Sequence, residues 1–212
     1  MTRAFVVGNG PSLAKTNLDK LAGEVSFAVN RIHLIYPRTS WRPTHYVRGE
    51  EQSLKSAAKY HEELQIHIDL GCDVWANLWF TKFTSMEVNT IKSCWHYTNH
   101  FDEPKAPHLW HLPMICSYGS SVNVAIQIAV QQGYKPIYLV GCDLGYRDNQ
   151  PSHFTPDYEK GIEGDLRPAR YANLDTLTAH MVAARSSPVK IFNATVGGEL
   201  EVYERVKCES LF

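Results

Sequence analysis

The residues best suited to chemistry lie near the start of the chain, in the segment Gly8-Asn9-Gly10-Pro11-Ser12-Leu13 after the apolar run Ala4–Val7. An apolar strand that leads into a glycine-rich turn is typical of a ligand-binding loop, because glycine adopts unusual backbone angles and lets a ligand approach the main chain. Pro11 suits the first position of a helix. Such a helix would direct free N–H groups toward an anion, for example a phosphate. An ordinary strand-to-helix turn is the alternative interpretation.

The loop matches neither of the two common nucleotide-binding motifs. Leu13 stands where the dinucleotide fingerprint G-x-G-x-x-G has its third glycine. The Lys-Ser/Thr pair of a P-loop is also missing after it.

Other polar residues follow the remaining predicted strands. In an open α/β sheet, ligands bind at the carboxyl ends of the strands, so we expect these residues to converge there. Taken singly, each has a structural alternative, such as a turn for Asn30 or a cap for Asp143. The residues are Asn30 and Arg31 after Val25–Val29, Gly49 and Glu50 after His45–Arg48, Asp143, Tyr146 and His153 after Ile137–Val140, and Asn193 and Thr195 near the last strand.

Apolar runs that alternate with helical patterns predict an α/β, Rossmann-like fold with a mostly parallel sheet and helices on both faces. The best-marked helix is 120–132, which begins with hydroxyl residues and ends before Gly133. Further helices are predicted at 12–22, 53–64 and 175–184, and further strands at 66–70 and 190–192. Residues 73–113 show no clear period, and further strands or an irregular insertion are both open there.

The length of 212 residues predicts a single domain over 1–212, with 147–172 as a short lid loop. Lysine plus arginine (21) balances aspartate plus glutamate (22), so neither nucleic acid nor an anionic membrane is the expected partner. No apolar stretch has the length of a membrane span, and no signal-peptide pattern is seen. Five scattered cysteines are typical of reduced thiols, which favours a cytoplasmic location.

With these residues in view, the chain resembles the small bacterial sialyltransferases and the superfamily that also contains motility-accessory-factor flagellin glycosyltransferases and archaeal hydroxymethylpterin diphosphokinases. The similar segments occur in the same order along nearly the whole chain. They are 8–13, Val29-Asn30-Arg31, Tyr118-Gly119-Ser120-Ser121, the block from Gly133 to Leu144 (GYKPIYLVGCDL), and Asn193-Ala-Thr-Val-Gly-Gly198.

The resemblance implies a nucleotide-dependent transferase in which a donor nucleotide lies over the first loop. It implies that Asn9 and Asn30 contact the nucleotide and its phosphate, and that Ser120 and Ser121 bind a cytidine monophosphate (CMP) unit. It further implies that Tyr146, and more weakly Tyr158, stabilises the leaving phosphate, and that His153 is the general base. The residues expected to bind the nucleotide are Gly8, Asn9, Gly10, Pro11, Ser12, Asn30, Arg31, Ser120, Ser121 and Tyr158, and the catalytic residues are His153, Tyr146 and Asp143.

The residue types suit this chemistry by themselves. Hydroxyl and amide groups can stabilise a leaving group that carries one phosphate without a metal. This agrees with the donor that the resemblance implies, a nonulosonic acid such as sialic acid activated by CMP. A histidine can take a proton from an acceptor hydroxyl near neutral pH. We therefore expect no metal and no cofactor. The main rival is a diphosphokinase that uses ATP with Mg²⁺ held by Asp143, Asp148 and Glu50.

Three other interpretations of the sequence involve zinc, a hydrolase nucleophile and a non-catalytic role. The pairs His96/His100 and His108/His111 have helix-like spacing, but no further zinc ligand is marked, so surface or core histidines are favoured. Ser120 and Ser121 lack the second glycine of G-x-S-x-G, so helix capping is favoured over a hydrolase nucleophile. A non-catalytic nucleotide-binding module is a further alternative. Homo-oligomers are a common default for such enzymes.

Overall fold

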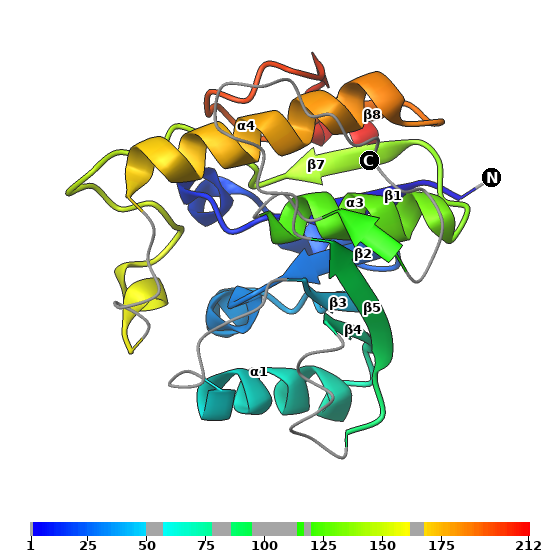
Figure 1. Ribbon diagram of the computed structural model, residues 1–212, viewed down its shortest axis with the longest axis vertical. Coiled ribbons are helices and arrows are strands. Elements are labelled where there is room, and N and C mark those ends of the chain that lie inside the picture. Colours follow the sequence, from blue (N-terminus) through cyan, green and yellow to red (C-terminus); the bar gives the residue numbers. More distant parts are fainter. Residues whose placement is uncertain (1, 50–56, 78–85, 95–113, 117–119, 162–167) are drawn as a thin grey trace.

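The computed structural model describes residues 2–49, 57–77, 86–94, 114–116, 120–161 and 168–212, which form a parallel β-sheet with helices on both faces (Figure 1). The described part contains nine strands in the order β6-β5-β4-β3-β2-β1-β7-β8-β9, and all eight neighbouring pairs are parallel. The α/β, Rossmann-like prediction is therefore confirmed. The strands are β1 (Ala4–Val7), β2 (Val25–Val29), β3 (His45–Arg48), β4 (Asp73–Asn77), β5 (Asn89–Cys94), β6 (Met114–Cys116), β7 (Ile137–Val140), β8 (Ile191–Asn193) and β9 (Glu204–Arg205).

Strand β1 lies inside the sheet, and its side chains are buried on both faces. Ala4 pairs with Val25 of β2 on one side and with Ile137 of β7 on the other. Ala4 and Val6 pack into one apolar core, whereas Phe5 and Val7 pack into the core on the opposite face. A strand covered on both faces needs apolar side chains at every position, which explains the unbroken run at the start of the chain.

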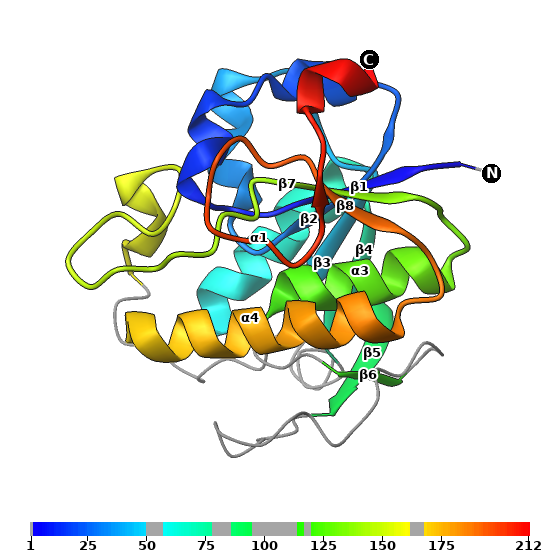
Figure 2. The same cartoon turned by 90° about the horizontal axis from the view of Figure 1, so that it is seen from above.

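Two long helices cover one face of the sheet, and a mixed layer covers the other (Figure 2). The first layer consists of α3 (Ser121–Gln131) and α4 (Ala169–Ser186). The second layer contains α1 (Ala57–Asp69) and short 3-10 helices at Pro11–Lys15, Leu18–Leu21, Ile32–Arg38 and Cys208–Leu211. The expectation of helices on both faces is confirmed.

Helix α3 agrees closely with the helix predicted at 120–132. The Ser120 hydroxyl accepts a hydrogen bond from the Asn123 N–H at 3.3 Å and so caps the first turn. Gly133, with a φ of 86°, follows the end of the helix, where a left-handed residue terminates it. The strand predicted at 190–192 is β8, displaced by one residue.

Two predicted elements are wrong. The helix predicted at 12–22 is a pair of 3-10 helices, the second of which begins where Asn17 accepts a hydrogen bond from the Asp19 N–H at 3.1 Å. The strand predicted at 66–70 falls largely in the last turns of α1. Tyr60, Leu64 and His67 recur at helical spacing and are buried, and this stripe outweighs the short alternation of apolar residues at 66–70.

The remaining predictions concern the middle of the chain and the lid. Strands β4 and β5 lie within 73–113, where further strands were one of the two expectations, and residues 78–85 and 95–113 are outside the described residues. The predicted lid, 147–172, contains a 3-10 helix at Pro156–Glu159, and α4 already begins at Ala169. In the described part of the chain, none of the helices has both the length and the apolar character that a bilayer span requires.

A buried histidine joins α1 to the sheet. The His67 ring stacks on Tyr46 with centroids 3.6 Å apart, and its Nε2 lies 2.9 Å from the Tyr36 hydroxyl. Burial lowers the pKa of His67 to about 4. Burial, together with the positive charge of Arg31, likewise lowers the pKa of the neighbouring His33 to about 4. Both imidazoles are therefore neutral in the folded protein at pH 7.

We predict that the free energy of unfolding falls as the pH drops from about 6.5 to about 4. In this window the unfolded chain protonates both histidines while the folded chain keeps them neutral, so acid favours unfolding. Urea unfolding followed by tryptophan fluorescence at pH 7.0, 6.0, 5.0 and 4.5 measures the effect. His67→Gln should reduce the pH dependence, and an equal dependence in both proteins would contradict the assignment.

Candidate functional site

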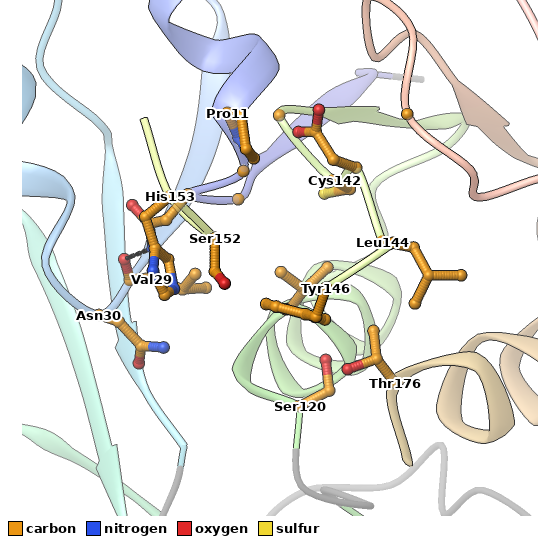
Figure 3. A pocket seen from close by; sticks show the side chains of 18 of the residues that line it. Pro11, Val29, Asn30, Ser120, Cys142, Leu144, Tyr146, Ser152, His153 and Thr176 are labelled. Carbon is orange, nitrogen blue, oxygen red and sulfur yellow. Dashed lines mark hydrogen bonds between the residues drawn. The ribbon is translucent and has the colours of Figure 1, made fainter. Parts of the chain in front are cut away.

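A pocket opens at the carboxyl ends of β1, β2 and β7. After β1 the chain builds β2, β3 and β4 on one side of it and later returns to add β7 and β8 on the other side. Ligands of open α/β sheets bind at such a topological switch point. The pocket is also lined by the first turn of α3, by the lid segment and by α4, and Figure 3 shows it from close by.

Most of the residues predicted for the site lie around this pocket. Two do not line it: Ser12 lies behind Asp143, and Arg31 contacts the backbone of the lid. The eleven that line the pocket are Gly8, Asn9, Gly10, Pro11, Asn30, Ser120, Ser121, Asp143, Tyr146, His153 and Tyr158.

Gly8 and Gly10 are required by contact between two loops of the protein itself. A Cβ atom on Gly8 would lie 2.6 Å from the Gly141 carbonyl oxygen, and one on Gly10 would lie 1.9 Å from Asp143 Oδ2. Neither glycine has a positive φ, so the expectation of unusual backbone angles here is wrong. The loops after β1 and β7 touch so closely that a side chain at position 8 or 10 does not fit.

Asp143 joins these two loops through its carboxylate. Its Oδ1 accepts a hydrogen bond from the Ser12 N–H at 3.0 Å, and its Oδ2 accepts one from the Ser12 hydroxyl at 2.7 Å. Burial raises the pKa of Asp143, while the hydrogen bonds from Ser12 act in the opposite direction. Both oxygens are therefore used to hold the β1 loop, and the catalytic role expected for Asp143 stays a prediction.

The anion site expected at the start of the first helix is absent from the structure. That helix is a five-residue 3-10 helix in which Pro11 has no N–H and the Ser12 N–H is bonded to Asp143. The Leu13 N–H is bonded to the Gly10 carbonyl. The negative charge at this helix start is thus supplied by the Asp143 carboxylate of the protein itself.

The two asparagines predicted to contact a nucleotide present opposite hydrogen-bonding groups. The Asn9 Nδ2 donates to the Val29 carbonyl at 2.8 Å, so its Oδ1, which is buried and unpartnered, is the group left for a ligand. The Asn30 Oδ1 accepts a hydrogen bond from Arg48 Nη1 at 3.2 Å, so the Nδ2 donor is the group that Asn30 offers to a ligand. Asn9 therefore suits a hydroxyl or amino group, and Asn30 suits a phosphate oxygen.

Ser120 and Ser121 are adjacent in sequence but differ in their bonding. The Ser120 hydroxyl caps α3, as described above, and can still donate its own proton. The Ser121 hydroxyl oxygen is buried and has no hydrogen-bond partner among the described residues. Figure 3 shows Ser120 beside Thr176 of α4 at one end of the pocket.

His153 lies at the opposite side of the pocket, within the lid. Its ring stacks on Tyr158 with centroids 3.7 Å apart, and it meets the Tyr146 ring in a T-shaped arrangement with centroids 6.4 Å apart. Its Nδ1 is 3.5 Å from Glu159 Oε1, outside hydrogen-bonding geometry. Burial, and then the charge of Arg31, lowers the pKa of His153 to about 4, so the imidazole is neutral at pH 7.

Sequence reasoning missed the contribution of α4 to the pocket. Thr176 and His180, one helical turn apart, line it. Asn173 fixes the Tyr146 backbone by accepting from its N–H and donating to its carbonyl, both at 2.7 Å. The available signal in the sequence was that Asn173, Thr176 and His180 are three or four positions apart. This spacing places them on one face of a helix, but it does not show what that face contacts.

The carboxylates expected to hold Mg²⁺ under the rival hypothesis have other contacts. Asp143 binds Ser12, and Asp148 Oδ1 accepts from the Ala169 N–H at 3.1 Å at the start of α4. Glu50 is outside the described residues, as are His96, His100, His108 and His111. In the part of the chain that is described, no three His, Cys, Asp or Glu residues gather in a way that could hold a metal ion.

Comparison with solved structures identifies the fold. The chain is similar to the structure of MAf glycosyltransferase from Magnetospirillum magneticum AMB-1, with a TM-score of 0.60 and 15% identity over 100% of this chain and 34% of that one. A sialyltransferase, CstII from Campylobacter jejuni in complex with the substrate analogue CMP-3FNeuAc, aligns with a TM-score of 0.48 and 14% identity over 97% of this chain and 86% of that one.

The chain thus spans about a third of the MAf glycosyltransferase, whose fold it shares. No family model matches the sequence. No curated protein matches it either.

We predict that Gly10→Ala destabilises the protein by about 2 kcal/mol, because the added methyl group collides with the Asp143 carboxylate. Asp143→Ala removes the two closest atoms, Oδ2 and Cγ, and leaves the Cβ at 2.9 Å, so Gly10→Ala should cost less in that background. Urea unfolding of the wild type, both single variants and the double variant measures the coupling. Additive effects would show that the two loops do not depend on this contact.

Proposed function

We propose that this protein is a glycosyltransferase that transfers a nonulosonic acid from a CMP-activated donor to a hydroxyl acceptor. The observation that carries the proposal concerns three buried polar atoms on residues that line one pocket at the switch point. Asn9 Oδ1, Ser121 Oγ and His153 Nδ1 have no hydrogen-bond partner among the described residues. Buried polar atoms are normally hydrogen-bonded, so three of them around one pocket indicate a polar ligand. The fold shared with a glycosyltransferase supports the same reading.

The lining of the pocket favours a leaving group of low charge. Among its described residues are hydroxyl, amide and imidazole side chains, together with the acids Asp143 and Glu199, and neither lysine nor arginine. Glu199 is paired with Arg147 at 2.5 Å, so a diphosphate or triphosphate would be repelled chiefly by Asp143 unless a cation accompanied it. One phosphate can be held by neutral donors such as Asn30 Nδ2 and the Tyr146 hydroxyl.

The proposed reaction is a direct displacement at the anomeric carbon of the donor. The acceptor hydroxyl oxygen forms the new bond to this carbon, and its proton passes to His153. The bond between the anomeric carbon and the phosphate oxygen breaks, and CMP leaves with the bonding electrons. Hydrogen bonds from Tyr146 and Asn30 stabilise the departing phosphate, while Asn9 accepts from a hydroxyl or amino group of the nucleotide.

The identity of the nucleotide can be tested by thermal shift and calorimetry. The panel contains cytidine, uridine, guanosine and adenosine nucleotides, each with and without Mg²⁺. We expect CMP to bind and stabilise the protein without metal. Stabilisation by ATP with Mg²⁺ alone would overturn the proposal in favour of a kinase. Binding of CMP without any turnover of a CMP-sugar would instead favour a nucleotide-binding module.

Ser121 and Ser120 form a matched pair for this panel. Ser121→Ala removes an unpartnered hydroxyl, so the stability of the ligand-free protein should be unchanged while CMP affinity falls about tenfold. Ser120→Ala removes the cap of α3 and should lower stability by about 1 kcal/mol. Equal CMP affinity in Ser121→Ala and the wild type would remove Ser121 from the binding site.

His153→Gln tests the general base. We expect it to lower the rate of sugar transfer roughly 10²- to 10⁴-fold with little change in CMP affinity. Because His153 acts in its neutral form, wild-type turnover should persist down to about pH 5 and fall as His153 protonates near its pKa of about 4. Release of CMP, corrected for spontaneous donor hydrolysis, measures both effects. Undiminished turnover in the variant would exclude this role.

A further inference from the structure

Arg31, predicted to bind a nucleotide, belongs to a buried ionic cluster between α1 and the sheet. Its Nε lies 3.1 Å from Glu63 Oε1, and both side chains are almost fully buried. The second oxygen of Glu63 lies 3.5 Å from Arg48 Nη1. A buried guanidinium is stable only when it is paired, and Glu63 on α1 provides this pairing for two arginines at once.

The same guanidinium holds the lid by its main chain. Arg31 Nη1 donates to the Tyr158 carbonyl and, at 3.2 Å, to the Lys160 carbonyl. Lys59 of α1 also donates to the Lys160 carbonyl. Two cations from different elements thus converge on the Lys160 carbonyl. The rigid guanidinium of Arg31 is ion-paired with Glu63 and also donates to the main chain of the lid.

The held segment is the one that positions His153. Tyr158 stacks face to face on the imidazole at 3.7 Å with an interplanar angle of 8°, and Glu159 faces Nδ1. The other end of the segment is fixed where the Phe154 N–H donates to the Asn9 carbonyl at 3.1 Å. Any displacement of Tyr158 therefore changes the place of the histidine ring.

We propose that Arg31 is a positioning residue, which clamps the lid through the Tyr158 and Lys160 carbonyls and thereby fixes His153 at the pocket. The proposal rests on the proposed function only in that His153 is taken as the base. Arg31 was predicted to contact a nucleotide, but its Nε and Nη1 contact groups of the protein. The Nε is ion-paired with Glu63, and the Nη1 donates to the lid.

The clamp also sets the charge environment of the imidazole. The groups that face His153 are Glu159 and Tyr158 of the lid, Tyr146 of the loop after β7, and Arg31 from beyond β2. Next to burial, Arg31 is the cause that lowers the pKa of His153. Loss of its charge should therefore raise this pKa, a response that a purely structural role in distant packing would not produce.

Three variants separate the parts of the clamp. Arg31→Met removes the charge and the fork but keeps the aliphatic stem, and Arg31→Lys keeps the charge without the fork. Arg31→Met combined with Glu63→Gln avoids leaving a buried carboxylate without Arg31 and serves if the single variant does not fold. The control is Arg38→Met, which removes an exposed arginine that donates to the Ala14 carbonyl at 3.1 Å.

Two measurements follow the clamp without any reaction. Hydrogen exchange of the amides in 154–161 should become at least tenfold faster in Arg31→Met and in Arg31→Lys, and should not change in Arg38→Met. In protein labelled with ¹³C-histidine, the His153 resonance, assigned by its loss in His153→Gln, should titrate at higher pH in Arg31→Met and in the double variant. Unchanged exchange and an unchanged titration would overturn the proposal.

Turnover then links the clamp to the reaction. With a CMP-sugar donor, Arg31→Met should reduce kcat ten- to a hundredfold with KM for the donor nearly unchanged, because a misplaced base slows the chemical step more than it weakens binding. The acid limb of its pH profile should move to higher pH. If exchange and titration respond but His153→Gln keeps full turnover, the clamp stands and the assignment of the base fails. If kcat stays at the wild-type value in Arg31→Met while His153→Gln loses turnover, the positioning role is wrong.

Discussion

The close contact between the loops after β1 and β7 is the constraint on which the pocket depends. Asp143 bonds Ser12 through both oxygens, and the space between the loops is too small for a Cβ atom on Gly8 or Gly10. The carboxyl ends of the two strands are thereby held together on one side. The loop after β2, the first turn of α3, the lid and α4 then complete the walls around the opening.

Much of the fold could be predicted because its signals are local. The apolar run of β1, and Ser120 and Gly133 around α3, each act within a few residues of their own position. The convergence of Asn9 and Asn30 followed from one general rule, since parallel strands deliver their carboxyl ends to one edge. The strand prediction at 66–70 is wrong because it rested on a short group of apolar residues at the end of a helix. The buried residues Tyr60, Leu64 and His67 recur at helical spacing over a longer segment, and α1 extends to Asp69.

The structural roles of individual residues could not be predicted, because these roles depend on contacts with residues distant in sequence. The glycines were correctly singled out, but the atom that excludes a side chain from Gly10 belongs to Asp143, 133 positions away. Arg31 was expected to face a ligand, yet its partners Glu63 and Tyr158 come from α1 and the lid. The spacing of residues along the sequence does not show which distant side chains come into contact.

The hold on the lid through carbonyl oxygens has a consequence for how this site could be altered. Arg31 and Lys59 contact main-chain atoms of Tyr158 and Lys160, which every amino acid possesses. These contacts therefore do not depend on which side chains the lid carries. Side chains of the lid can therefore be exchanged while its main-chain contacts to Arg31 and Lys59 stay the same.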